Sequence, residues 1–365
     1  MRGYDFTKLK GPLLLAVNHS GSFLDAMILG ALFNRDMYFL ARGDAFKKPV
    51  ARKLLEALHN IPIFRLSEGK ENMGQNDETF ERCQQIFRKN GIVLIFAEGL
   101  CIHEWKLRPL KKGTARMAIS AWAEADTADL TILPIGVNYS SFKDFNSSIY
   151  INVGDPISAK TVEAAKGMVN PLQVNRVLTE SMEAQIFHFP NEDATYAAAY
   201  AAMLFNAPAT DKDVLHAMGD QLQQTPKERL SFFTTPGHKA IAWNGGQLLF
   251  SFLTALVLAI PALAGYLINA PFYYPVRNFA RKKTNKTVFY GSVFLGLLMI
   301  AYLIYALLLS ALSCIWLGVW GLLGIVALPL LGWTVGKFRD AWWRIMNYGK
   351  LKAEDRIYLR GLFKK

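Results

Sequence analysis

Three long apolar segments in the last third of the chain constrain its fold most. They read QLLFSFLTALVLAIPALAGYLINA (247–270), VFYGSVFLGLLMIAYLIYALLLSAL (288–312) and IWLGVWGLLGIVALPLLGWTVG (315–336), and none contains a charged residue. About 20 apolar residues suffice to cross the hydrocarbon core of a bilayer. The alternative is a set of buried helices in a soluble protein, but the last two segments have no polar face to turn toward water. The sequence therefore predicts a C-terminal membrane region.

The charges beside these segments bear on their topology. The loop RNFARKKTNK (277–286) contains no acid, and the tail from 337 to 365 is strongly basic. The positive-inside rule favours the cytoplasmic side for both. In the favoured arrangement, 288–312 and 315–336 form a spanning hairpin, while 247–270 enters the membrane and returns with a kink near Pro261. In the other arrangement all three segments span the membrane.

Composition indicates which classes of partner and which cellular compartment suit this chain. The formal charge of +12 and the pI near 9.5 suit an anionic membrane surface, an acidic substrate or a nucleic acid. Many basic residues flank the apolar segments and no nucleic-acid-binding motif is present, so we expect no nucleic-acid partner. Cys83, Cys101 and Cys314 are widely spaced and odd in number, which fits a reducing compartment. The first ten residues lack the apolar core of a signal peptide, so we expect no secretory targeting.

The first 157 residues alternate between strand and helix patterns. Short apolar runs predict strands at 12–17, 37–42, 61–65, 92–99, 130–139 and 148–157. Helical spacing predicts helices at 22–33, 49–60, 77–90 and 111–125. This alternation predicts an α/β domain, with a mixed sheet flanked by helices. A helical extension or linker (158–246), the membrane region (247–336) and a basic tail (337–365) follow.

The segment NHSGSFLD (18–25) is the first candidate for chemistry. His19 follows the first predicted strand, and Asp25 falls in the first turn of the next helix. One interpretation is a capping box, in which Ser22 caps the helix and His19 is an ordinary turn residue. In the other, the Asp25 carboxylate holds one ring nitrogen of His19 and leaves the second as a general base.

Two other kinds of catalytic site fit the sequence poorly. NHSGSFLD lacks the G-x-S-x-G context of a nucleophilic serine. HEWKL (103–107) lacks the second histidine of a zinc motif, and no Cys/His cluster exists, so we expect no metal.

Further candidates lie at the ends of other predicted strands, where α/β sheets bind ligands. Arg65 can bind a phosphate or carboxylate with two parallel hydrogen bonds, although a solvated arginine would look the same. Glu98 and Gly99 end the most apolar strand, and a basic run with Arg108 and Lys112 follows. Pro134 interrupts a strand and could line a pocket or mark an edge strand.

Taken in order, N-H-x5-D, P-I-x-R, E-G followed by K-x-G-x-A, and L-P-I-G resemble the four motifs of the glycerolipid acyltransferases. The lysophosphatidate (1-acylglycerol-3-phosphate) acyltransferases are the best-known members of that family. The resemblance covers residues 11–157 and makes 1–157 the acyltransferase domain. It implies that His19 deprotonates the acceptor hydroxyl, that Asp25 orients His19, and that Arg65 contacts the acceptor phosphate.

The same resemblance assigns the remaining motif residues. Glu98 and Gly99 match the third motif and belong to the acceptor site. Pro134 matches the proline of the fourth motif, and we expect it to line the pocket together with Asn18 and Ser22.

Two departures from the family pattern matter. Five residues separate His19 from Asp25, where four are commoner, although some fungal glycerol-phosphate members show the longer spacing. The third motif reads FAEGLC (96–101) instead of F-P-E-G-T-R, so its arginine is missing. Arg108 or Lys112 could supply that charge. The loss keeps a lyso-aminolipid open as the acceptor.

The expectation is an integral-membrane O-acyltransferase with its catalytic domain on the cytoplasmic face and membrane lipids as its surroundings. It would transfer a fatty acyl chain from acyl-CoA or acyl carrier protein, with no cofactor, to a lyso-glycerolipid such as 1-acylglycerol-3-phosphate in phospholipid biosynthesis. Glycerol-3-phosphate, a lyso-aminolipid, and a non-catalytic lipid-binding role are the alternatives.

Overall fold

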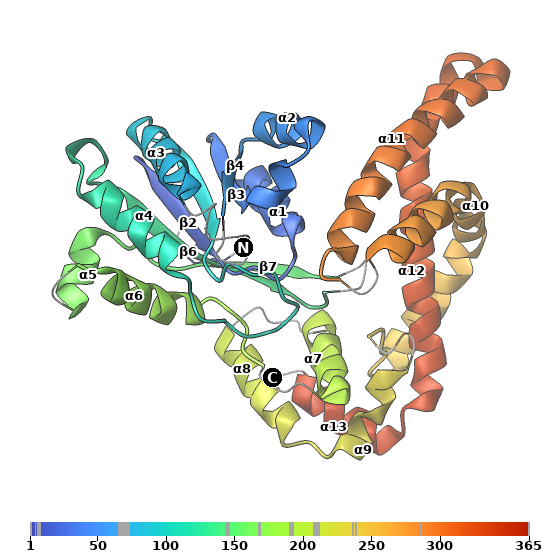
Figure 1. Cartoon of the computed structure of the whole chain (residues 1–365). Coiled ribbons are helices and arrows are strands. Elements are labelled where there is room, and N and C mark those ends of the chain that lie inside the picture. Colours follow the sequence, from blue (N-terminus) through green and yellow to red (C-terminus); the bar gives the residue numbers. More distant parts are fainter. Residues whose placement is uncertain are drawn as a thin grey trace. The chain divides into compact units, whose positions relative to one another are not determined.

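A computed structural model describes most of the chain, and Figure 1 shows its ribbon. The described residues are 2–3, 5, 9–64, 74–142, 147–166, 169–189, 193–206, 212–235, 237, 239–284 and 287–363. The chain divides into two compact units. The first contains 1–139 and 149–188, and the second contains 140–148 and 189–365.

The first unit is built on a mixed sheet of seven strands in the order β1-β7-β6-β2-β5-β3-β4. The strands are β1 (Arg2–Gly3), β2 (Leu13–Val17), β3 (Met37–Arg42), β4 (Asn60–Ile63), β5 (Ile92–Phe96), β6 (Thr131–Tyr139) and β7 (Ile149–Val153). Strand β7 pairs antiparallel with β6, and the other pairings are parallel. Every residue of the central strand β2 is buried, which explains its unbroken apolar run.

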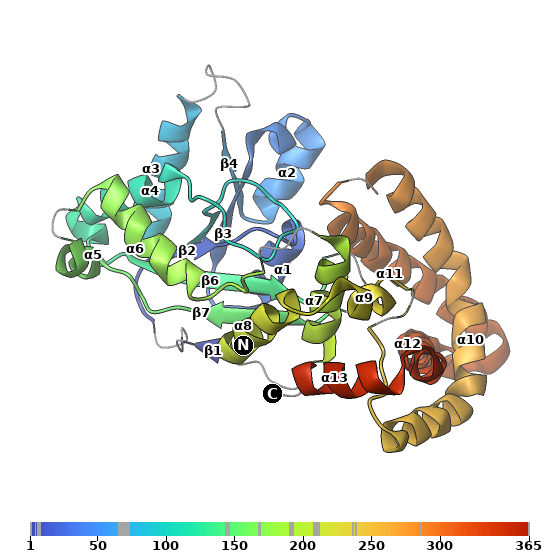
Figure 2. The ribbon, with the colours of Figure 1, turned by 90° about the horizontal axis from the view of Figure 1, so that it is seen from below.

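Helices cover both faces of this sheet, as Figures 1 and 2 show. α1 (Phe23–Leu32) and α2 (Pro49–Ala57) lie on one face. α3 (Gln75–Arg88), α4 (Lys112–Trp122) and α6 (Pro171–Glu183) lie on the other. The change of face follows the chain, which steps from β2 to β3 to β4 and then back to β5 and β6. Right-handed crossovers put opposite steps on opposite faces.

The larger part of the core lies under α3, α4 and α6. Helix α6 buries Val174, Leu178 and Met182 at a spacing of four residues, and these side chains join the core cluster of the sheet. α5 (Ala159–Lys166) precedes α6 in the same unit. The compact unit therefore runs to His188, past residue 157, where the strand pattern of the sequence ends.

Strand β1 was not predicted, and the predicted elements of the sheet unit differ from the observed ones mainly at their ends. Strand β7 stops at Val153, and Ile157 forms only an isolated bridge with Ile132. Strand β5 stops at Phe96, because the chain turns at Ala97–Leu100. The prediction of an α/β domain with a mixed sheet is confirmed. Short 3-10 helices follow β3 (η2, Gly43–Phe46) and α4 (η5, Ala125–Thr127).

The second unit is helical in its described residues. Its elements are α7 (Ala194–Asn206), α8 (Lys212–Gln223), α9 (Lys227–Leu230), η6 (Ser231–Thr234), α10 (Gly245–Thr284), α11 (Tyr290–Leu317), η7 (Gly318–Leu323), α12 (Gly324–Lys350) and α13 (Ala353–Phe363). Two helical stretches, Gly245–Thr284 and Tyr290–Lys350, are long and apolar enough to cross a membrane. Most residues in their most apolar windows are not buried by protein.

The three predicted apolar segments fall in these stretches. Segment 247–270 lies in α10, which is helical through Pro261. The other two belong to α11 and α12, and the chain turns between them at Gly318, whose φ is +56°, and at η7. The turn thus lies at 318–323, a few residues beyond the predicted position. Placement of these segments in a membrane stays a prediction.

Candidate active site

The His19–Asp25 pair forms at the end of the central strand. His19 Nδ1 lies 3.1 Å from Asp25 Oδ2, so the imidazole N–H donates to the carboxylate. The imidazole stacks on the ring of Phe96, with 3.7 Å between the ring centroids. In the part of the chain that the structure describes, Nε2 bonds to no protein group. This nitrogen is therefore available to accept a proton.

Asp25 is held from three sides. Its Oδ2 atom also accepts the Gly21 backbone N–H at 2.9 Å, and its Oδ1 atom accepts the Tyr139 hydroxyl at 2.5 Å. The side chain of Asp25 has no exposed area, and three donors satisfy this buried carboxylate. Burial and the Asp25 charge raise the pKa of Tyr139 above its usual range, so its hydroxyl stays a donor.

The capping-box interpretation is wrong for this turn. Ser22 occupies the N-cap position of α1 but makes no side-chain capping hydrogen bond. Its φ of 61° and ψ of −141° are a combination that residues other than glycine rarely adopt. The chain turns at Ser22, and the Asp25 carboxylate reaches the imidazole although five residues separate His19 from Asp25.

Glycine is required at position 21. A Cβ atom there would overlap the Tyr139 hydroxyl and Asp25 Oδ1. The Gly21 N–H also points at the carboxylate, as described above. Backbone and side chains therefore pack together around Asp25 without spare space.

Glu98 lies beside the pair, at the end of β5. Its Oε1 atom accepts the backbone N–H of His19 at 3.3 Å. Burial raises the pKa of Glu98 to about 7, against the opposing effects of the His19 N–H and the Arg108 charge. The backbone N–H of Arg108 also donates to this carboxylate. Glu98 thus ties β2 to the segment that follows β5.

The third-motif segment folds back over the end of the sheet. Gly99 has a φ of +69°, and a side chain there would press on Lys111. The Lys111 N–H donates to the Ala97 carbonyl at 2.8 Å. Arg108 lies at Glu98 and pairs with Glu104 at 3.7 Å. Lys112 is exposed at the first residue of α4, so of the two proposed substitutes only Arg108 touches the Glu98 group.

Asn18 and Pro134 have structural roles in the sheet. Asn18 exchanges two hydrogen bonds with the Val137 backbone, at 2.7 and 3.0 Å, and so extends the pairing of β2 with β6. Pro134 lies opposite Ala16 inside β6, which is a central strand, so the edge-strand interpretation is wrong. Its carbonyl accepts the Gly154 N–H at 2.9 Å, where β7 diverges from β6.

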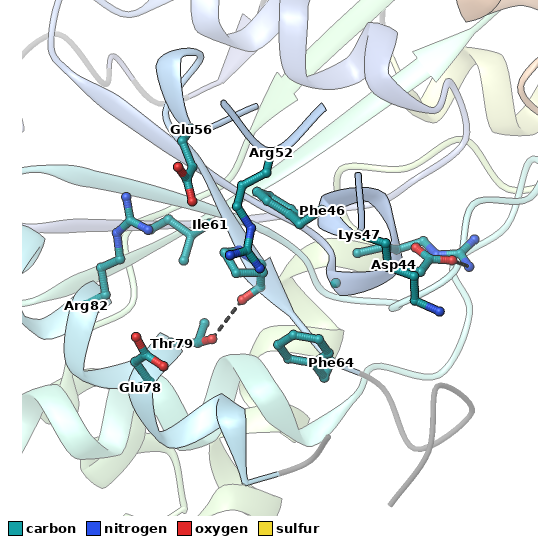
Figure 3. Close-up of a pocket in the computed structure, with 13 residues that line it drawn as sticks. Asp44, Phe46, Lys47, Arg52, Glu56, Ile61, Phe64, Glu78, Thr79 and Arg82 are labelled. Atoms are coloured by element: carbon teal, nitrogen blue, oxygen red, sulfur yellow. Dashed lines mark hydrogen bonds and ion pairs between the residues drawn. The ribbon is translucent and has the colours of Figure 1, made fainter. Parts of the chain in front are cut away.

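A cleft of about 690 Å³ opens at the ends of β3 and β4, between α2 and α3 (Figure 3). Lys47, Arg52 and Arg82 line it, and none of the three has an ion-pair partner among the described residues. Glu56 and Glu78 also line the cleft, and Arg42 there is paired with Asp44. Its lining continues to Phe64. Arg65, the predicted phosphate contact, follows Phe64 in the sequence but lies outside the described residues.

We call the group of His19, Asp25 and Tyr139 the His19 corner. The cleft and the His19 corner lie at the same edge of the sheet. Strands β2, β5, β3 and β4 are parallel neighbours, so their carboxyl ends lie side by side. At about 4.8 Å per strand, β3 and β4 lie roughly 10 and 15 Å from β2. The described residues contain no group of three or more His, Cys, Asp or Glu side chains suited to a metal ion.

Comparison with known proteins identifies the first unit. Residues 1–138 match the family model described as Acyltransferase, and this segment contains His19, Asp25 and Glu98. The N-terminal domain belongs to the acyltransferase family. Over 105 residues the chain is 32% identical to glycerol-3-phosphate O-acyltransferase 2 of Saccharomyces cerevisiae. The matched segment is 29% of this chain and 14% of that protein, so the likeness covers a small part of the relative.

The sequence did not reveal three residues that build the site of the acyltransferase domain. Tyr139 ends the apolar run of β6, at the same sheet edge as His19, and a polar residue at a strand end was a usable signal. Gly21 and Phe96 gave no comparable signal. Their roles depend on contacts that no local pattern contains.

Proposed function

We propose that the chain is a membrane-bound O-acyltransferase. It transfers a fatty acyl chain from acyl-CoA or acyl carrier protein to the hydroxyl of a lyso-glycerolipid, with 1-acylglycerol-3-phosphate as the first candidate. The observation that carries the proposal is the His19–Asp25 pair, in which Nδ1 is held at 3.1 Å and Nε2 is available. The acyltransferase-family match over residues 1–138 supports the same reaction type.

The proposed reaction uses His19 as a general base. The acceptor hydroxyl gives its proton to Nε2, and its oxygen attacks the carbonyl carbon of the acyl thioester. The ester C–O bond forms, the C–S bond breaks, and the proton on Nε2 passes to the leaving thiolate. Asp25 holds the tautomer and stabilises the imidazolium that forms in between. No covalent enzyme intermediate is needed.

The charge of the cleft supports an acceptor with an anionic headgroup. Lys47, Arg52 and Arg82 face space at the sheet edge where the reaction would occur. Arginine binds phosphate with two parallel hydrogen bonds. Arg65, which follows this cleft in sequence, keeps its proposed role as a phosphate contact.

Glycerol-3-phosphate is the second candidate acceptor. The name of the yeast relative favours it, since that protein is a glycerol-3-phosphate O-acyltransferase. A lyso-aminolipid is the third candidate acceptor, because the arginine of the third motif is missing. A non-catalytic lipid-binding role is the remaining alternative, and the intact His19–Asp25 pair argues against it.

The apolar helices support a membrane setting. α10, α11 and α12 expose many large apolar side chains, which lipid would cover. We propose that the acyltransferase domain lies on the cytoplasmic face, as the basic loop and tail indicate.

A panel of acceptors tests the proposal. The full-length chain in nanodiscs is given labelled acyl-CoA, or acyl carrier protein loaded with the same chain, together with 1-acylglycerol-3-phosphate, glycerol-3-phosphate or a lyso-aminolipid. Acylation of 1-acylglycerol-3-phosphate with the highest kcat/KM is the expected result. Faster acylation of another acceptor would replace the first candidate, and no transfer to any acceptor would leave only the lipid-binding role.

A further inference from the structure

Helix α2 exposes an apolar stripe on the acyltransferase domain itself. Val50, Leu54 and Leu58 follow one another at a spacing of four residues, with exposed fractions of 81, 61 and 58%. This spacing places them on one side of the helix. None of the α2 residues is buried, and Ala51 and Leu55 are half-buried. The stripe therefore points away from the domain.

Four cations lie close to this stripe in the sequence. Lys47 and Lys48 precede α2, and Arg52 and Lys53 lie within it. Among the residues that the structure describes, none of these four forms an ion pair, and Glu56 is the acid within the helix. An apolar strip beside unpaired cations is the pattern of helices that lie on an anionic lipid surface.

Helix α1 adds apolar area on the same face of the sheet. Phe23 and Met27, also four residues apart, are exposed on it. We call Phe23, Met27, Val50, Leu54 and Leu58 the α1–α2 surface. Helix α1 begins directly after the turn that holds His19, so α1 contributes both to this surface and to the His19 corner.

We propose that the α1–α2 surface docks on anionic lipid, as a contact of the acyltransferase domain that is separate from the spanning helices. Charge decides the occupant. The flanking cations complement a negative lipid headgroup layer, whereas a second copy of the same surface would bring cations against cations. Docking would hold the entrance to the His19 corner at the depth where a lipid hydroxyl lies.

The opposite face of the sheet offers a matched control. Leu172, on α6, is also an exposed leucine, with an exposed fraction of 76%. Helix α6 lies on the sheet face opposite to α1 and α2 (Figure 2). A probe at Leu172 reports on an exposed apolar position outside the proposed surface.

The test labels these two positions in the full-length chain. Leu54→Cys and Leu172→Cys are made in a Cys101→Ala/Cys314→Ala background and labelled with an environment-sensitive fluorophore. Each protein is placed in nanodiscs of phosphatidylcholine, with or without phosphatidylglycerol. Iodide quenches from the water, and a nitroxide on the lipid headgroup quenches from the membrane. Both readouts are independent of acyl transfer.

We expect the nitroxide to quench the label at position 54, more strongly with phosphatidylglycerol, and iodide to quench the label at position 172. Lys53→Gln should weaken the phosphatidylglycerol effect by up to about five-fold. Equal iodide quenching at both positions would overturn the proposal. So would a label at position 54 that is shielded from both quenchers, because protein would then cover the surface.

Discussion

The His19 corner and the β3–β4 cleft lie on the same edge of one sheet and are built in opposite ways. In the corner, the Asp25 carboxylate has three donors and no exposed area. In the cleft, Arg52 and Arg82 have no ion-pair partner among the described residues. Side chains that transfer a proton must be held in position before the substrate arrives. Side chains that bind an anion stay without an ion-pair partner until the anion pairs with them. The corner should therefore control kcat and the cleft should control KM.

A large effect is expected for Asp25→Asn. The amide removes the charge that stabilises the imidazolium, and the tautomer of His19 is no longer held. We expect kcat to fall by about 10²-fold or more, with KM nearly unchanged. Initial rates over a range of acceptor concentrations measure both. Asp36→Asn, at an exposed turn, is the matched control, and an equal loss in that variant would show a general effect of the substitution.

The raised pKa of Glu98 predicts that the free energy of unfolding depends on pH. Its pKa is about 7 in the folded protein, against an ordinary value of 4.5, so the folded state binds this proton more tightly than the unfolded state. Raising the pH from about 4.5 to 7 should therefore destabilise the fold, by on the order of 3 kcal/mol at most. Glu98→Gln is neutral throughout and should lose this decline.

Thermal unfolding of the full-length chain from pH 5 to pH 8 measures the difference. The difference between the melting temperatures of Glu98→Gln and the wild type should shift in favour of Glu98→Gln as the pH rises. Glu163→Gln, at an exposed position of α5, should follow the wild type. If the melting temperatures of the wild type and Glu98→Gln changed equally with pH, burial would not raise the pKa of Glu98.

The smallest effect is expected in the cleft. Arg82→Gln removes one of its cations and should raise KM for an anionic acceptor by about five- to ten-fold, as one charge-assisted hydrogen bond would. The kcat value should stay close to that of the wild type. Arg116→Gln, at an exposed position of α4, is the control. A large fall in kcat with an unchanged KM would show that the cleft and the corner do not divide binding and chemistry in this way.

Local patterns in the sequence were enough to predict strands β2 to β7 and helices α1 to α4, but not the short edge strand β1. The apolar run of β2 and the helical spacing of α1 each lie within a few consecutive residues. His19 and Asp25 could be paired for the same reason, since one strand end and one helix turn contain both.

Contacts between distant segments were not predictable. Ser22 fits a capping box locally, but Asp25 is also bonded by Tyr139, which lies 114 residues away in sequence. The cleft likewise depends on five separate elements, β3, η2, α2, β4 and α3. The packing of α6 against the sheet depends in the same way on partners outside its own segment.

The most direct test of the account is acyl transfer by His19→Ala. The full-length variant in nanodiscs is compared with the wild type and with His59→Asn, a histidine at a turn of positive φ where asparagine is tolerated. The account predicts that kcat/KM of His19→Ala falls by about 10²- to 10⁴-fold, while that of His59→Asn stays near the wild-type value. Wild-type turnover by His19→Ala would contradict the central claim that this histidine is the general base.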